Sequence, residues 1–108
     1  MNMDNTSLQN LPLKGIKVID AASFIAAPLV SALMSDYGAE VIKIEHLTGD
    51  TYREAVIGGH VWPESEMDWA FILENRNKRS LSIDLKTEYG QAILKKLINE
   101  SDVFITNL

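Results

Sequence analysis

The sequence predicts an α/β fold, a Rossmann-like parallel sheet with flanking helices. Three observations lead to this prediction. Short runs of β-branched and other apolar residues, typical of buried strands, recur along the chain. Stretches with helical periodicity lie between them, and the connections are short, which favours parallel strand–helix–strand units. With 108 residues, the chain provides at most one small domain.

The first half of the chain reads as strand, helix and strand. Residues 15–20, GIKVID, predict a strand opened by a glycine. Pro28 suits the first turn of a helix over residues 28–37, and Gly38 is a natural stop for it. A second strand is expected over residues 41–45. The expected apolar face of the helix comprises Leu29, Val30, Leu33, Met34 and Tyr37.

The second half is less regular at first. Residues 46–63 predict a long loop, after which Ser65 is expected to cap a short helix over residues 67–73. A third strand is expected over residues 80–84. Thr87 then caps a helix over residues 87–99, and a last strand covers residues 103–106. The expected apolar face of this last helix comprises Tyr89, Ile93 and Leu97, with Ala92 and Leu94 as further candidates.

The two ends of the chain carry their own predictions. Residues 1–12 are expected to form a flexible lead-in, with the folded part over residues 13–108. The chain stops two residues after an apolar strand, whereas a helix normally covers such a strand. The sequence therefore predicts a domain that is truncated.

Composition excludes several classes of function. Fifteen acidic residues against ten basic ones give a net charge of −5, which argues against a nucleic-acid binder. The absence of cysteine rules out disulfides, thiolate metal ligands and a cysteine nucleophile. No tight ligand spacing surrounds His46 or His60, so no metal is expected. Neither a signal peptide nor a membrane-spanning stretch is visible, and a soluble, cytoplasmic protein is expected.

The expected ligand site lies beyond the carboxyl ends of the strands, where open α/β sheets bind their ligands. These ends are residues 21–27, 45–46, 84–86 and 107–108. A dinucleotide site would need glycines at the first strand-to-helix turn, and residues 21–28 contain none. Glu45 stands where a ribose-binding acid would, but a lone glutamate is weak support. A glycine-rich phosphate loop with its lysine is also absent.

Four segments occur in an order and spacing that resemble a known family. They read LKGIKVIDAASFIAAP, DYGAEVIKIEHLTGD, ENRNKRSLSIDLKTEYGQAILKKLI and SDVFITN. Together they are similar to the N-terminal part of the class III coenzyme A transferases. The resemblance covers residues 13–108 and implies coenzyme A or an acyl-CoA as substrate, with no metal. It also implies a homodimer for the full-length protein.

The resemblance also implies which residues bind coenzyme A across the strand ends. Those after the first strand would line the site, His46 and Lys86 would approach phosphate, and Ile83 would lie against adenine. Asn107 would close the fourth strand end. The full set is Ser23, Phe24, Ile25, Ala26, His46, Ile83, Lys86 and Asn107.

The reaction implied by the resemblance moves coenzyme A from an acyl-CoA to a small carboxylic acid, a 2-hydroxy or aryl-lactate acid. An aspartate attacks the thioester, and an anhydride and then an enzyme thioester follow. No aspartate here matches that nucleophile, and Asp20 and Asp84 are interpreted as turn or cap residues. The chain alone is therefore expected to be inactive. Two alternatives are an acyl-CoA racemase of the same family and a non-catalytic module for coenzyme A binding or assembly.

Overall fold

The computed structural model describes residues 10–54 and 68–107, and in this part of the chain the strands form one parallel sheet in the order β3-β2-β1-β4. This confirms the predicted Rossmann-like α/β architecture. The strands are β1 (Lys17–Asp20), β2 (Glu40–Glu45), β3 (Arg79–Ser82) and β4 (Val103–Ile105). The helices are α2 (Ala26–Asp36), α3 (Trp69–Asn75) and α4 (Glu88–Asn99), with a 3₁₀ turn, η1 (Thr51–Glu54).

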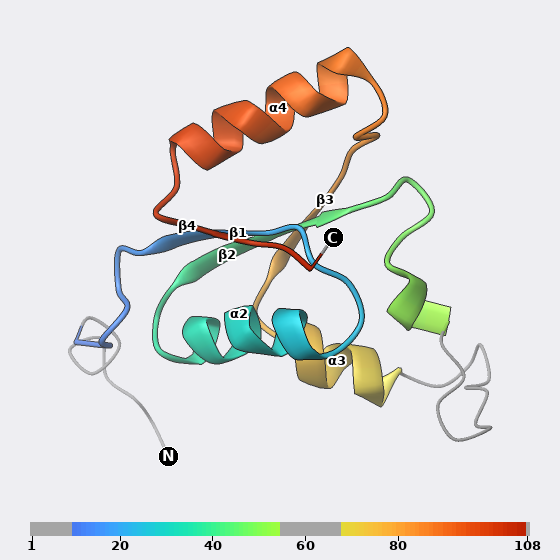
Figure 1. Ribbon diagram of the computed structural model, residues 1–108. Coiled ribbons are helices and arrows are strands. Elements are labelled where there is room, and N and C mark those ends of the chain that lie inside the picture. The colour runs from blue at the N-terminus through green and yellow to red at the C-terminus, as the bar shows by residue number, and fades with distance from the viewer. Residues whose placement is uncertain (1–9, 55–67, 108) are drawn as a thin grey trace.

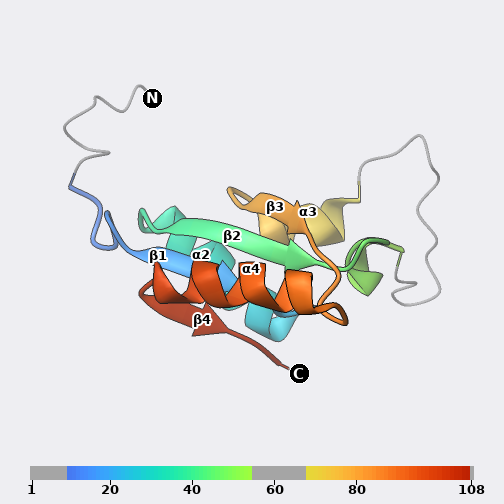
Figure 2. The same ribbon diagram turned by 90° about the horizontal axis from the view of Figure 1, so that it is seen from above.

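The elements form three layers, with α4 on one face of the sheet and α2 and α3 on the other (Figure 1). Strand order explains this division. The chain steps from β1 to β2 to β3 in one direction, and α4 then carries it back past β1 to β4 (Figure 2). Because parallel crossovers keep one hand, reversing the direction of travel places the helix on the opposite face. The strand order therefore reverses between β1 and β4, where such folds place their ligands.

The first strand begins later than predicted. Gly15 has a φ of +87° and lies in a turn before the strand, not in it. In this turn the Ile16 amide donates to the Leu13 carbonyl over 3.0 Å. The positive φ requires glycine there and is incompatible with extended strand backbone. The first nine residues of the expected lead-in lie outside the described residues.

Helix α2 ends as predicted at Gly38, whose φ is +105°. The Ala39 amide donates to the Met34 carbonyl and the Gly38 amide to the Ser35 carbonyl, both over 3.0 Å. These two bonds form a Schellman motif, which satisfies carbonyls left open at the helix end.

The predicted apolar face of α2 is only partly correct. Of its members, Leu29 is half-buried and Met34 packs against buried apolar residues of the sheet. The buried residues of this helix are Pro28, Ser31 and Ala32, while Val30, Leu33 and Tyr37 are between 45% and 56% exposed. Ser31 turns inward because its hydroxyl donates to the Asp20 carboxylate over 2.6 Å. A buried carboxylate needs such donors, and this requirement overrides the hydrophobic periodicity of the helix.

Helix α3 and strand β3 also differ from their predicted limits. Ser65 lies outside the described residues, and the cap of α3 is Asp68, whose side chain accepts the Phe71 amide over 3.0 Å. Strand β3 covers residues 79–82 instead of 80–84. Asp84 forms a turn, because its side chain accepts the Lys86 amide over 3.0 Å. This confirms the interpretation of Asp84 as a turn residue.

Helix α4 begins after Thr87, whose hydroxyl accepts the Gly90 amide over 3.0 Å, which confirms the predicted cap. Its apolar face is only partly as predicted. Ile93, Leu94 and Leu97 pack against a buried cluster of Ile19, Ile44 and Ile83. Tyr89 is 79% exposed, because its neighbour Gly90 is the residue that faces inward against the Asp84 backbone.

The face of the sheet under α2 changes character along the strands. Near their amino ends, Val18, Ala39 and Val41 form a second buried apolar cluster. Towards their carboxyl ends, the buried positions on this face are Asp20 and Lys43, which are register partners in the β1–β2 pair. Charge is therefore concentrated at the edge of the sheet where the ligand site was predicted.

Candidate functional site

A small open pocket lies beyond the carboxyl ends of β1, β2 and β3. Its volume is about 100 Å³, well below the several hundred Å³ of a complete small-molecule site. It could therefore hold one part of a larger ligand, with the rest lying across the surface. The lining residues are Ala21, Ala22, Ser23, Ile44, Glu45, His46, Asp50, Thr51 and Leu85.

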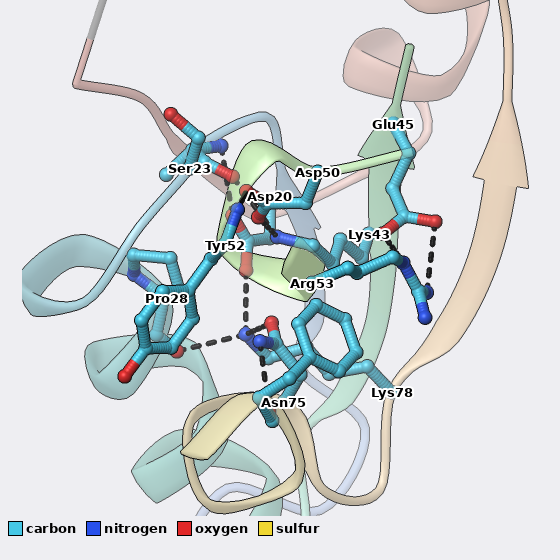
Figure 3. A network of polar contacts seen from close by, with 12 residues as sticks. Asp20, Ser23, Pro28, Lys43, Glu45, Asp50, Tyr52, Arg53, Asn75 and Lys78 are labelled. Carbon is cyan, nitrogen blue, oxygen red and sulfur yellow. Dashed lines mark hydrogen bonds and ion pairs between the residues drawn. The ribbon is translucent and has the colours of Figure 1, made fainter. Parts of the chain in front are cut away.

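A buried ion pair joins Asp50, which lines this pocket, to Lys43 of β2 (Figure 3). Lys43 Nζ is 2.8 Å from Asp50 Oδ2, and both side chains are 2% exposed. Lys43 Nζ also donates to the carbonyl of Ala22 over 3.0 Å. Although burial opposes ionisation, hydrogen bonds from Lys43 and from the Tyr52 amide hold the pKa of the Asp50 carboxyl below its ordinary value.

A second buried ion pair lies deeper, between the sheet and helices α2 and α3. Lys78 Nζ is 2.7 Å from Asp20 Oδ2 and also donates to the carbonyl of Pro28 and the side chain of Asn75. Burial lowers the pKa of Lys78, and the Asp20 carboxylate opposes that change. Asp20 also accepts the Ala22 amide over 2.9 Å, which confirms it as a turn residue. Neither Asp20 nor Lys78 lines the pocket.

Glu45 is occupied by structural partners. Its two carboxylate oxygens accept from Arg53 over 2.9 Å and 3.1 Å, and Ser80 donates to it over 2.7 Å. Although burial opposes ionisation, these bonds hold the pKa of Glu45 below its ordinary value. Arg53 also lies over the ring of Phe71, 4.0 Å from its centroid. Glu45 is thus engaged by protein groups, which argues further against a ribose-binding role.

Three of the residues expected to bind coenzyme A are brought together. Ser23 and His46 line the pocket. The Asn107 side chain forms two hydrogen bonds with the Ser23 backbone. It accepts the Ser23 amide over 3.1 Å and donates to the Ser23 carbonyl over 2.8 Å. The end of β4 is therefore joined to the end of β1 where the strand order reverses. Asn107 itself does not line the pocket but is bonded to the backbone of Ser23, which does.

The next residues of the loop after β1 lie beside the pocket and do not line it. Phe24 has a φ of +71°, and its ring lies 5.3 Å from that of Tyr52. Ile25 is the N-cap position of α2 and supplies no side-chain capping bond, and Ala26 is the first residue of the helix. Phe24, Ile25 and Ala26 are all exposed.

The two residues expected to bind coenzyme A after the third strand, Ile83 and Lys86, lie in different environments. Ile83 is 7% exposed and belongs to the apolar cluster under α4, so Leu85, two residues later, lines the pocket in its place. Lys86 is exposed. The Asp84 side chain accepts the Lys86 backbone amide and so fixes the backbone at this residue. The position of the Lys86 ammonium therefore depends only on the conformation of its own side chain.

Sequence reasoning missed the loop after β2 as a wall of the pocket. Asp50 and Thr51 line the pocket, but residues 46–63 were interpreted only as an irregular loop. A signal for Asp50 was present: Lys43 stands inside an otherwise apolar strand, at a position that must be buried. A buried lysine needs an acidic partner, and Gly49-Asp50 is the first loop segment able to turn back to it.

The described residues contain neither a cluster of metal ligands nor a membrane-spanning helix. No group of three or more histidine or acidic side chains there could hold a metal ion. No helix in residues 10–54 and 68–107 is long and apolar enough to cross a membrane.

Comparison with known proteins identifies the family. The sequence model described as "CoA-transferase family III" matches residues 13–108. The chain is 46% identical over 98 residues to a (R)-2-hydroxy-4-methylpentanoate CoA-transferase of Clostridioides difficile, covering 89% of this chain and 24% of that protein. It is 41% identical over 93 residues to a cinnamoyl-CoA:phenyllactate CoA-transferase of Clostridium sporogenes, covering 86% of this chain and 23% of that protein.

The fold agrees with a solved structure as well. A CAIB/BAIF family protein from Brucella suis superposes with a TM-score of 0.78 at 36% identity, over 93% of this chain and 26% of that one. A parallel α/β sheet with a pocket at the carboxyl ends of its strands defines a protein of the Rossmann-like fold class. The chain belongs to family III of the CoA-transferases. It spans about a quarter of the length of the relatives it matches.

Proposed function

We propose that this chain supplies the coenzyme A-binding part of a CoA-transferase. The observation that carries the proposal is the pocket at the carboxyl ends of β1, β2 and β3, in a chain of this family. Its lining residues combine apolar Leu85 with the polar residues Ser23, His46 and Thr51. Such a mixture suits a nucleotide base and its neighbouring phosphates.

The remaining expected residues would act around the pocket. The exposed ammonium of Lys86 would reach a phosphate, and His46 would approach another from the end of β2. Ile83 would support the base from beneath, through the apolar cluster. Phe24, Ile25 and Ala26 would contact parts of coenzyme A that extend beyond the pocket.

We assign the chemical step to residues outside this chain. In residues 10–54 and 68–107, each aspartate side chain accepts a hydrogen bond or ion pair from a structural partner, so none stands ready as a nucleophile. The residues are Asp20, Asp36, Asp50, Asp68, Asp84 and Asp102. An aspartate from the remainder of a full-length protein would attack the thioester.

The proposed acceptor is a 2-hydroxy acid, of the kind named for the two bacterial relatives. The full-length protein is proposed to be a homodimer. The exposed apolar side chains of Val30, Leu33 and Tyr37 on α2 support a surface that further protein covers.

Binding of coenzyme A to the Lys86→Ala variant tests the proposal. One charge-assisted contact of about 1.5–3 kcal/mol predicts a roughly ten- to hundred-fold loss of affinity by calorimetry. The loss should shrink as salt rises, because Lys86 is exposed. Lys14→Ala removes the same charge from an exposed residue before β1, at the opposite end of the sheet, and should bind as wild type does. Equal affinities for all three would remove Lys86 from the site, and no binding by wild type would refute a self-sufficient site.

A further inference from the structure

Lys43 joins the two loops that form the pocket. Its ammonium reaches the Ala22 carbonyl in the loop after β1 and the Asp50 carboxylate in the loop after β2. Ala22 and Asp50 both line the pocket, whereas Lys43 does not. We infer that Lys43 is a positioning residue for coenzyme A, a buried cation that sets the separation of the two loops without touching the ligand. The inference rests on the proposed coenzyme A site.

Asp50, held by Lys43, forms hydrogen bonds with the backbone of both loops. Its Oδ1 atom accepts the Tyr52 amide over 2.9 Å, which fixes the turn that follows. The Phe24 amide also helps to hold the pKa of Asp50 down, after burial, which opposes ionisation, and the larger contributions of Lys43 and Tyr52. The tilted contact of the Phe24 and Tyr52 rings, whose centroids are 5.3 Å apart, reinforces the same junction. One carboxylate therefore ties the loop after β1 to the loop after β2, and Lys43 holds that carboxylate in place.

Lys43 also neutralises the wall of the pocket. Asp50 is an anion at a site proposed to receive phosphates, and an unpaired carboxylate there would repel them. Pairing with Lys43 at 2.8 Å cancels most of that repulsion. Glu45, another residue that lines the pocket, has its carboxylate paired with Arg53 in the same way. An acidic chain can thus present a wall that accepts an anion.

The test removes the tether without leaving a buried charge. Lys43→Met alone would leave the buried Asp50 carboxylate without its cation. The substitution is therefore combined with Asp50→Asn, whose side-chain oxygen can still accept the Tyr52 amide. The second ion pair offers a matched control. Lys78→Met combined with Asp20→Asn makes the same substitutions in a pair that is equally buried and does not line the pocket. Both double variants are checked for folding by circular dichroism.

Two measurements are then made well below the unfolding temperature of each variant. Calorimetry with coenzyme A should show about a tenfold loss for the Lys43/Asp50 variant and less than about a threefold change for the control, because the charge-assisted link between the Ala22 carbonyl and Asp50 is lost only in the former. Hydrogen exchange without ligand should show faster exchange of the Tyr52 amide in the Lys43/Asp50 variant alone. A residue that served stability only would not separate the two variants in this way.

The outcomes separate this inference from the proposed function. If wild type binds coenzyme A and the Lys43/Asp50 variant binds equally well, Lys43 is not a positioning residue, and the proposed function stands. If wild type does not bind, the proposed function fails for this chain. Hydrogen exchange then decides whether Lys43 holds the loops: unchanged protection of Tyr52 in the variant would refute that as well.

Discussion

Substituting Gly90 by alanine should destabilise the protein, although alanine is the better helix former. In an ordinary helix interior the change stabilises by about 0.5–1 kcal/mol. Here a Cβ atom on Gly90 would lie 2.0 Å from the Asp84 carbonyl oxygen and 3.0 Å from the Thr87 hydroxyl. Backbone must then shift, at a cost typical of overpacking, about 1–3 kcal/mol.

The shift would also disturb the start of α4. The Asp84 carbonyl accepts the Thr87 hydroxyl over 2.8 Å, and that hydroxyl caps the helix by accepting the Gly90 amide. Weakening such a cap costs about 1 kcal/mol. Subtracting the propensity gain leaves a net loss of about 1–3 kcal/mol, which for a domain of this size lowers Tm by roughly 4 °C or more.

Urea unfolding and thermal melting followed by circular dichroism measure this loss. Tyr89→Ala is the matched control, because it changes the neighbouring position, whose side chain is 79% exposed. It should alter stability by no more than about 0.5 kcal/mol. A Gly90→Ala variant as stable as wild type would show that α4 does not approach the Asp84 backbone this closely, and the placement of Leu85 at the pocket would fall with it.

Two other predictions concern pH and catalysis. The pKa values of Glu45 and Asp50 lie below their ordinary 4.5 and 3.8, so their contribution to stability is complete above those values and is lost as pH falls through and below them. Melting curves between about pH 3 and 6 should show Tm falling on acidification, less steeply in Glu45→Gln, and a flat profile would contradict the two pairings. The chain incubated with an acyl-CoA and a 2-hydroxy acid should form no new thioester. Turnover that survives repurification would place the nucleophile within these residues.

The pocket was located by topology more reliably than by individual residues. Parallel strands align their carboxyl ends at one edge of the sheet, so the order of elements was enough to bring Ser23 and His46 together. Ile83 and Leu85 show the limit. Which of them faces the pocket depends on where β3 ends, and that is decided by the turn at Asp84 and its bond to the Lys86 amide.

The helix faces show a similar division. The sequence of α2 has an apolar stripe through Val30, Leu33 and Tyr37, but this stripe is exposed. The helix instead buries Ser31, because the Asp20 carboxylate beneath it requires a donor. The apolar periodicity of α2 contains no information about which hydrogen-bond donors a buried charge on another element requires. Here that charge is Asp20 on β1, eleven positions before Ser31.

By itself, the sequence determined the class of fold, the order of the elements, the stop at Gly38, the cap at Thr87 and the edge of the sheet where the pocket lies. These follow from local backbone preferences and from the alternation of strands and helices, which act over a few residues. Only the tertiary structure decided that Lys43 pairs with Asp50, Lys78 with Asp20 and Asn107 with the backbone of Ser23. The last two partnerships span 58 and 84 residues. All three arise because a charge or an amide brought near the sheet must find a partner among the groups that the fold places beside it.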